Sequence, residues 1–305
     1  MTSGAIQHLL SLPASIAGGF ASLEDRRPPE WYADCDPPGG NLGSGGATVH
    51  LLLAAWRRLG GALSFAEWLR SSRKLIIHGG GRSRRLPAYA VVGKPLMPVP
   101  VLRWSRGQRL DQTLLDLQAP EYRRILDHAT GAYAVMVTSG DVLLRFGRPL
   151  PPFPRVDVLG LGMPVAPEQA SPFGVFFCPR GRPGALAFFL QKPPADRIRE
   201  LARDHAFWVD TGMWLLSERA VEVLLRKTGV EAVRSDGSGT TPRFYELYAG
   251  LGLSLGERPA EPDPEIGGLT SAVVPLPEPE FYELGTSRQM VESMSLLQNR
   301  YGGEG

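Results

Sequence analysis

The sequence predicts an α/β protein with three layers (α/β/α), in which helices cover both faces of a mostly parallel, mixed sheet. Short apolar runs typical of buried strands alternate with segments whose apolar residues recur at helical spacing. Glycine- and proline-rich stretches separate these segments and mark the turns. The length of 305 residues and the 43% hydrophobic content allow one large domain with a sizeable core.

The predicted elements follow from these patterns in chain order. Strands are expected at 30–36, 74–78, 133–146, 155–166 and 206–217, and a hairpin is expected at 172–193. Helices are expected at 47–60, 64–73, 194–205 and 217–229. Ser64 and Glu67 have the spacing of a capping box at the start of the second helix. Within a single domain 1–305, we interpret residues 1–29 as an N-terminal helical segment and the proline-rich residues 257–279 as an irregular excursion.

The basic residues are unevenly distributed, although the formal net charge is only +2. Ten of them lie between Arg70 and Arg109, where the chain has no Asp or Glu. Several surround the glycine-rich segment 79–85, and unbalanced positive charge beside bare backbone favours the binding of an anion. Because a near-neutral chain offers too little positive surface for nucleic acid, we expect a small polyanion as the partner.

Membrane insertion and histidine-based metal binding are both disfavoured by the sequence. No apolar run reaches the roughly 18 to 20 residues that a membrane helix needs. Cys35 and Cys178 fit no ligand spacing, and the five histidines form no paired motif. We therefore expect reduced, buried thiols and a cytoplasmic protein with no membrane partner.

In sheets of this type, ligands bind beyond the carboxyl ends of the strands. We expect the glycines at 43–46, the basic loop at 79–85, Asp141 and Asp210 to share that edge. Glycines let backbone N–H groups approach phosphate oxygens, arginines can hold two oxygens at once, and a carboxylate can hold a metal ion. The pattern GxxxxGK[ST] is absent around Lys94, which excludes an ordinary P-loop.

Two segments, "LGSGGATVHLL" and "IIHGGGRSRRLPAYAVVGKPLMPVP", resemble the split signature of the L-fucose-1-phosphate guanylyltransferases (GDP-fucose pyrophosphorylases). Residues 190–193, 208–224, 244–256 and 281–290 are similar to further segments of that family. The chain most resembles the N-terminal half of the bacterial bifunctional fucokinase/guanylyltransferases. This resemblance implies a Rossmann-like nucleotide-diphospho-sugar transferase fold.

The resemblance also implies a reaction, in which GTP and β-L-fucose 1-phosphate give GDP-L-fucose and pyrophosphate. The sugar phosphate would attack the α-phosphorus in line with Mg²⁺ as cofactor and with no covalent intermediate. Family members continue past "GTS" into a parallel β-helix, whereas this chain ends at "NRYGGEG". We expect the catalytic domain alone, without the β-helix, and a fucokinase domain would belong to a longer parent chain.

The resemblance assigns roles to particular residues. Arg82 and Arg85 would hold the β- and γ-phosphates, Lys94 the α-phosphate, and Lys192 the sugar 1-phosphate. Asp210 and Gly212 would line the sugar pocket, while Asp141 and Glu283 would hold the metal ion. The nucleotide-binding residues implied are Gly43, Ser44, Gly45, Gly46, Gly80, Gly81, Ser139 and Gly140. The same residues also have plainer explanations, as turns, exposed charges or helix caps.

Alternative functions remain open at this point. Another sugar-1-phosphate nucleotidyltransferase would use the same phosphate-binding residues with a different base or sugar. A nucleotide-sugar-dependent glycosyltransferase would usually show a DxD-like metal motif, but "SGDVL" offers a single acid. A catalytically silent nucleotide-binding domain would be free to lose the set formed by Arg82, Arg85, Lys94 and Asp141, and this chain retains it.

Overall fold

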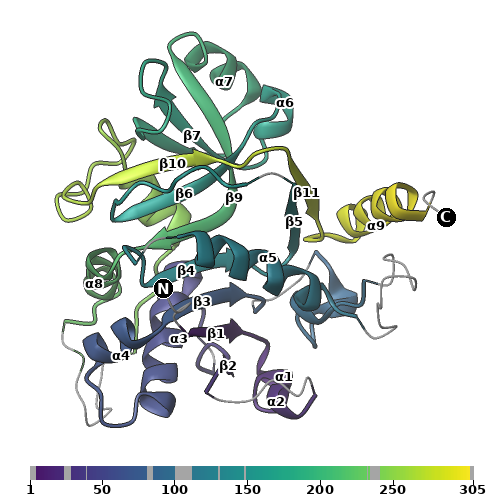
Figure 1. Ribbon diagram of the computed structural model, residues 1–305, viewed down its shortest axis with the longest axis vertical. Coiled ribbons are helices and arrows are strands. Elements are labelled where there is room, and N and C mark those ends of the chain that lie inside the picture. Colours follow the sequence, from purple (N-terminus) through teal and green to yellow (C-terminus); the bar gives the residue numbers. More distant parts are fainter. Residues whose placement is uncertain are drawn as a thin grey trace.

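A nine-stranded sheet forms the centre of the molecule, and a two-stranded sheet lies beside it (Figure 1). The computed structural model describes residues 5–23, 29–38, 40–80, 85–99, 112–129, 131–147, 149–231, 233 and 241–302. In these ranges the strands are β1 (Ile6–Ser11), β2 (Trp31–Asp34), β3 (Arg73–His78), β4 (Val135–Ser139), β5 (Val142–Phe146), β6 (Val158–Met163), β7 (Gly174–Pro179), β8 (Phe188–Gln191), β9 (His205–Leu216), β10 (Ser271–Pro275) and β11 (Pro279–Glu283).

The large sheet is mixed and has one wholly parallel half. Its strand order is β10-β6-β9-β4-β3-β1-β2, with β7 and β8 joined to the far end of β9. Strands β2, β1, β3 and β4 run parallel, so their carboxyl ends meet at one edge. Strand β9 runs antiparallel to its neighbours β4, β6 and β7. β5 and β11 form the separate antiparallel ladder.

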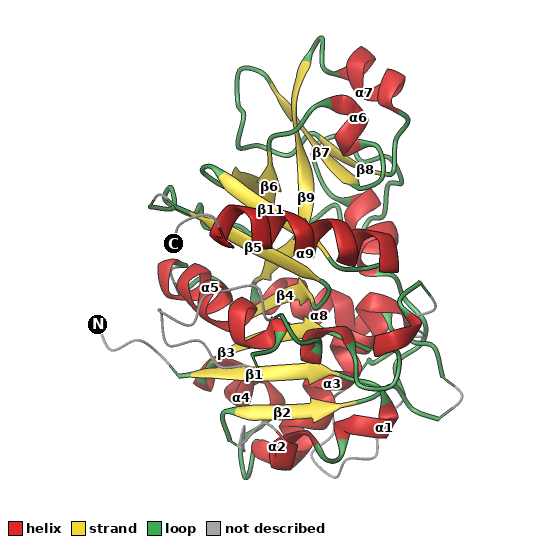
Figure 2. Cartoon of the chain, turned by 90° about the vertical axis from the view of Figure 1, so that its right-hand side faces the viewer, coloured by secondary structure: helices red, strands yellow, loops and turns green. Residues whose placement is uncertain are grey.

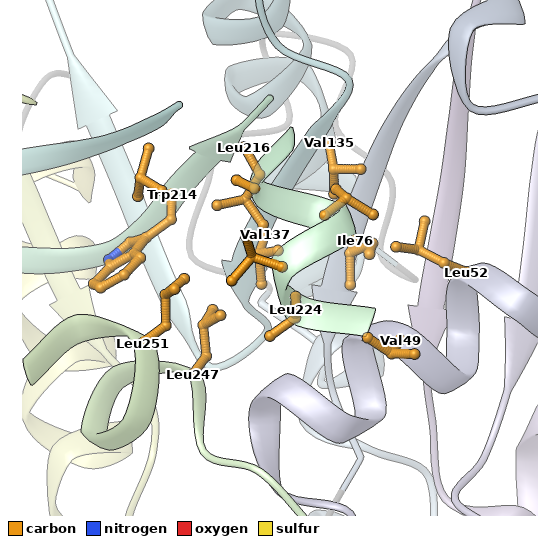
Figure 3. Close-up of a cluster of buried hydrophobic side chains, with 14 of the residues drawn as sticks. Val49, Leu52, Ile76, Val135, Val137, Trp214, Leu216, Leu224, Leu247 and Leu251 are labelled. Atoms are coloured by element: carbon orange, nitrogen blue, oxygen red, sulfur yellow. The ribbon is translucent and has the colours of Figure 1, made fainter. Parts of the chain in front are cut away.

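Helices cover both faces of the parallel half, which confirms the three-layer prediction. One face packs against α3 (Gly43–Leu59), α4 (Phe65–Ser71) and α8 (Glu218–Lys227), and the other against α5 (Leu114–His128) and the short α1 (Ala14–Ala17) and α2 (Phe20–Leu23). In Figure 3, apolar side chains from α3 and α8 point toward those of the strands, including Val49, Leu52, Leu224, Ile76, Val135 and Leu216. No described helix is long and apolar enough to cross a membrane.

Further described helical segments lie at the β7–β8 hairpin, beside β11 and against α3. α6 (Pro167–Ala170) and α7 (Ala195–Leu201) pack beside the β7–β8 hairpin, at the end of the molecule farthest from β2 (Figure 2). The C-terminal α9 (Ser287–Gly302) follows β11 and contacts it. A short π-helical turn at Leu247–Leu251 packs against α3.

The prediction of a helical segment at residues 1–29 was wrong in its first part. Residues Ile6–Ser11 form β1, which lies between β2 and β3 in the parallel half of the sheet. Almost every residue of β1 is buried because helices cover both of its faces. A strand buried on both faces shows no polar–apolar alternation, so its apolar run cannot be distinguished from a buried helix by periodicity.

Two further predictions need correction. The irregular excursion predicted for 257–279 contains β10, an edge strand that pairs in parallel with β6. The strand predicted at 133–146 is two strands that belong to different sheets, with a turn at Gly140 and Asp141 between them. A Cβ on Gly140 would lie 2.8 Å from the His78 carbonyl oxygen, so the turn is possible only because this residue has no side chain.

Candidate active site

Lys94 and Asp141 form an ion pair at the carboxyl edge of the parallel strands. Lys94 Nζ lies 2.7 Å from Asp141 Oδ2, and the two side chains are only 13% and 24% exposed. Ser139 Oγ donates to Asp141 Oδ1 at 2.5 Å, so both carboxylate oxygens have a donor. The structure therefore brings together three residues that the sequence predicted for the site, and their partial burial strengthens the interaction between the charges.

Glycines and one proline hold this ion pair in place. Gly93 has φ +83°, a conformation that favours glycine, and it starts the 3₁₀ turn that carries Lys94. Pro95, which follows Lys94, packs against Gly79 and Gly140. A Cβ added to Gly79 would lie 2.4 Å from the Pro95 ring, and one added to Gly140 would lie 2.7 Å from it. Pro95 thus packs the 3₁₀ turn that carries Lys94 against the loop after β3 and the turn after β4.

Glu283 supplies a second carboxylate to this edge. It ends β11 opposite Val142, the residue after Asp141, and the Leu284 amide donates to the Asp141 carbonyl oxygen at 2.8 Å. Burial and, secondly, the negative charge of Asp141 raise the pKa of Glu283, while a hydrogen bond from Gln289 and the charge of Arg85 oppose this rise. Arg85 itself is exposed, and its carbonyl oxygen accepts from the Ser287 amide at 3.0 Å.

A metal ion would find few protein ligands here. Among the described residues, no group of three or more His, Cys, Asp or Glu side chains could hold one. Asp141 and Glu283 are a pair of hard oxygen donors, and a cation at such a pair takes its remaining ligands from water or from substrate phosphates. The donor set fits Mg²⁺ bound together with a nucleotide better than a closed structural site.

The first glycine-rich segment is the first turn of α3 rather than a free loop. The amides of Gly45 and Gly46 both donate to the Tyr245 carbonyl oxygen, at 2.8 Å and 3.1 Å. Ser44 Oγ donates to Glu246 Oε2 at 2.8 Å. A Cβ on Gly45 or Gly46 would lie less than 3 Å from Tyr245 or Arg243. Nucleotide binding by Gly43, Ser44, Gly45 and Gly46 stays a prediction, and the amides of Gly45 and Gly46 are already engaged within the chain.

Asp210 and Gly212 lie in β9 beside the end of β4. Asp210 Oδ1 accepts from the Gly212 amide at 2.8 Å and from Trp214 Nε1 at 2.9 Å, and burial raises the pKa of Asp210 to about 7. Gly212 has φ +75°, and a Cβ added to it would lie 3.5 Å from Ser139 Cβ. The hydroxyl of the half-buried Tyr248 donates to the Gly212 carbonyl oxygen at 3.1 Å. Gly212, one of the predicted sugar-pocket residues, therefore lies beside Ser139, which donates to Asp141.

Other predicted residues are not brought into this cluster. Lys192 is exposed, has φ +51°, and makes no side-chain hydrogen bond or ion pair with any described residue. A Cβ on Gly80 would lie 2.7 Å from Ser11 Oγ, which places Gly80 against the end of β1. Gly81 and Arg82 fall outside the described residues.

Sequence reasoning missed several side chains that complete the cluster. His78 ends β3, and its Nε2 lies 2.9 Å from Thr48 Oγ1 of α3. Burial lowers the pKa of His78 to about 4, so its imidazole is neutral near pH 7. Gln289 contacts Glu283, and Tyr248 contacts Gly212. Of these residues, only His78 could have been recognised from the sequence, because it is a polar residue directly after an apolar run that is typical of a buried strand.

Comparisons with known proteins give the family. The family described as "Fucose pyrophosphorylase domain" matches residues 66–239. The chain is 41% identical over 295 residues to the L-fucokinase/L-fucose-1-P guanylyltransferase of Bacteroides fragilis, covering 97% of this chain but 30% of that protein. The inositol-1-phosphate CTP transferase of T. maritima matches with 12% identity and a TM-score of 0.35 over 97% of both chains. A UTP-bound UGPase from Acinetobacter baumannii matches with 10% identity and a TM-score of 0.40, over 75% of this chain and 97% of its own. On the sequence matches, the chain belongs to the fucose pyrophosphorylase domain family.

Proposed function

We propose that this chain transfers the GMP group of GTP to L-fucose 1-phosphate, producing GDP-L-fucose and pyrophosphate. The observation that carries the proposal is the shielded Lys94–Asp141 pair at the carboxyl edge of the parallel strands, where Pro95 packs against Gly79 of the loop after β3. A cation and a carboxylate at this edge would serve a nucleoside triphosphate and a sugar phosphate that meet there. Membership of the fucose pyrophosphorylase domain family supports the choice of substrates.

Lys94 would act on the transferred group. An oxygen of the sugar phosphate attacks the α-phosphorus, and pyrophosphate leaves from the opposite side. Charge on the equatorial oxygens has to be neutralised in that transition state, and a preorganised ammonium in a shielded site can do so. Arg82 and Arg85 would hold the leaving pyrophosphate, because guanidinium groups bind two oxygens at once.

Asp141 and Glu283 would hold Mg²⁺, which supplies charge neutralisation to the phosphates when it is bound. Burial first and the negative charge of Asp141 second raise the pKa of Glu283, and a shared cation would offset both. Ser139 orients Asp141 through its hydroxyl, and Gln289 contacts Glu283.

Asp210 and Gly212 would bind the sugar. Asp210 Oδ1 is occupied by two donors, which leaves Oδ2 to accept from a sugar hydroxyl. Lys192 would reach the sugar 1-phosphate from the exposed end of the β7–β8 hairpin. In a longer parent chain, a fucokinase domain would supply fucose 1-phosphate, as the name of the B. fragilis relative suggests for that protein.

The experiment is a substrate matrix. GTP, ATP, CTP and UTP are each paired with the 1-phosphates of fucose, glucose and mannose, and pyrophosphate release is measured with and without Mg²⁺. We expect turnover to be highest with GTP and fucose 1-phosphate, and the product mass should be that of GDP-fucose.

Other outcomes point to the alternatives. Faster turnover with another pair would make the chain a different sugar-1-phosphate nucleotidyltransferase. Sugar transfer from GDP-fucose to an acceptor, with no pyrophosphate release from any pair, would identify a glycosyltransferase.

A further inference from the structure

Gln289, in the first turn of α9, contacts the carboxylate of Glu283. We propose that Gln289 is a positioning residue of the divalent-cation site, which fixes Glu283 beside Asp141 so that both carboxylates can serve one ion. The inference rests on the proposed function, because it takes Asp141 and Glu283 as the cation ligands.

The side-chain amide of Gln289 lies beside the Glu283 carboxylate and near the backbone of Gly285. Its Nε2 donates to Glu283 Oε2. Its Oε1 lies 3.4 Å from the point where a Cβ on Gly285 would be, and Asp141 Oδ2 lies 3.0 Å from the same point. The bare backbone of Gly285 therefore leaves room for both the side-chain oxygen of Gln289 and the Asp141 carboxylate.

Hydrogen bonds at the start of α9 hold the backbone from which the Gln289 side chain extends. The main-chain N–H of Gln289 donates to Thr286 Oγ1 at 3.1 Å, and this hydrogen bond caps the start of α9. Ser293 Oγ, one turn further on, donates to the Glu283 carbonyl oxygen at 2.6 Å. The first turns of α9 thus hold Glu283 through both its main chain and its side chain.

Glu283 needs such a contact. The β5–β11 ladder brings its backbone next to Asp141, but the carboxylate stands beyond rotatable bonds and beside a like charge. Among the described residues, Gln289 makes the one hydrogen bond to that carboxylate. Without it, repulsion would favour a rotamer that points away from Asp141. Side chains that orient a metal ligand typically contribute about 10- to 100-fold in metal affinity.

The test replaces Gln289 by Met, which keeps the length of the side chain and removes its hydrogen bonds. Gln298→Met is the matched control, because Gln298 is exposed on the same helix. Mn²⁺ binding to the free protein is measured from the electron paramagnetic resonance signal of the unbound ion. We expect the dissociation constant to rise at least about 10-fold in Gln289→Met and to stay unchanged in the control.

Kinetics supply a second readout that a purely structural role would not give. In Gln289→Met the Mg²⁺ concentration for half-maximal rate should rise, and kcat at saturating Mg²⁺ should largely recover. A lower kcat with unchanged Mg²⁺ dependence would contradict the inference. If Gln289→Met does not fold, Gln289→Asn keeps the amide on a side chain one methylene shorter and should show the same loss.

Asp141→Asn separates failure of this inference from failure of the proposed function. That variant should lose Mn²⁺ binding, which shows that the measured ion is at this site. Wild-type Mn²⁺ affinity in a folded Gln289→Met protein would overturn the inference and leave the proposed function standing. Absence of Mn²⁺ binding by the wild-type protein would overturn both the cation site and the role of Gln289.

Discussion

At the scale of single residues, the partial burial of Lys94 makes it the strongest candidate for transition-state stabilisation. Its ammonium is held by Asp141 and lies on a turn packed by Pro95. Lys94→Ala should lower kcat by about 100- to 1,000-fold, as loss of one oxyanion donor does in other enzymes. The affinity for GTP should fall only modestly, because the lysine acts mainly on charge that grows during the reaction.

Steady-state kinetics and GTP titration of Lys94→Ala measure the two effects separately. Thermal unfolding of the same variant is the control, because the change leaves Asp141 half-buried without its partner. A kcat close to that of the wild type would remove Lys94 from the mechanism.

Asp210 should make the stability of the protein depend on pH. Burial raises the pKa of Asp210 from 3.8 to about 7, so the folded state binds its proton more tightly than the unfolded state. Its stabilising contribution is complete below about pH 4 and is lost as the pH rises through about 7. Each unit of pKa difference corresponds to about 1.4 kcal/mol.

Asp210→Asn removes this titration and retains an oxygen that can accept from Gly212 and Trp214. Relative to the wild type, the variant should therefore gain stability between pH 4 and pH 7. Urea unfolding at several pH values measures the difference. Parallel pH profiles for the two proteins would show that Asp210 does not titrate in this range.

The sequence proposed Lys94, Asp141 and Asp210 as candidates, because each is a charged residue in a segment with a recognisable pattern. It could not identify Gln289 or Tyr248, whose roles arise from contacts with residues that are distant in the chain or on another element. Nothing in "SRQM" alone indicates that one glutamine faces Glu283. Such residues can be recognised only once the structure shows which elements contact one another.

At the scale of elements, α4 shows what local sequence can determine. Ser64 Oγ accepts from the Glu67 amide at 3.3 Å, and the Ser64 amide donates to Glu67 Oε2 at 2.8 Å, so the predicted capping box is confirmed. Ser64→Ala should lower the free energy of unfolding by about 1 kcal/mol. Ser295→Ala on the exposed surface of α9 is the control and should change it by less than about 0.5 kcal/mol.

Chemical denaturation at constant pH measures both serine variants. Equal stability of Ser64→Ala and the wild-type protein would mean that the cap is replaced by water. The experiment concerns a surface helix end, so activity should be unchanged in either case.

β1 and β10 show what local sequence cannot determine. Both were missed because the identity of a strand depends on its neighbours: β1 is covered on both faces, and β10 pairs with β6, more than 100 residues earlier. The fold class was nevertheless predictable, because alternation of strands and helices leaves few other arrangements. The antiparallel direction of β9 was not predictable, because the sequence of a single strand does not indicate the direction in which it pairs.

At the scale of the whole molecule, β9 joins the β7–β8 hairpin to the rest of the large sheet. Its 12 residues pair with β7 at the start and with β4 and β6 toward the end. Because one strand belongs to both regions, loss of either region exposes part of the other. We expect a single cooperative unfolding transition.

Hydrogen exchange tests this expectation residue by residue. The slowest amides of β4 and β7 should share the same opening free energy, because both open only in global unfolding. Scanning calorimetry should give a van't Hoff enthalpy equal to the calorimetric one. Much faster exchange throughout β7 and β8 would show that the hairpin region unfolds by itself.

The return of the last segments to the centre of the fold has a consequence for how the protein is made. β10 completes the large sheet beside β6, while Glu283 and α9 complete the edge that carries Lys94 and Asp141. A ribosome delivers these pieces after β6 and β9, so a growing chain holds one edge of β6 unpaired until residues 271–275 have emerged. Exposed edges of this kind promote aggregation. Nascent chains stalled before β10 should therefore depend on chaperones far more than chains in which β10 has emerged, and none of them can carry both Asp141 and Glu283.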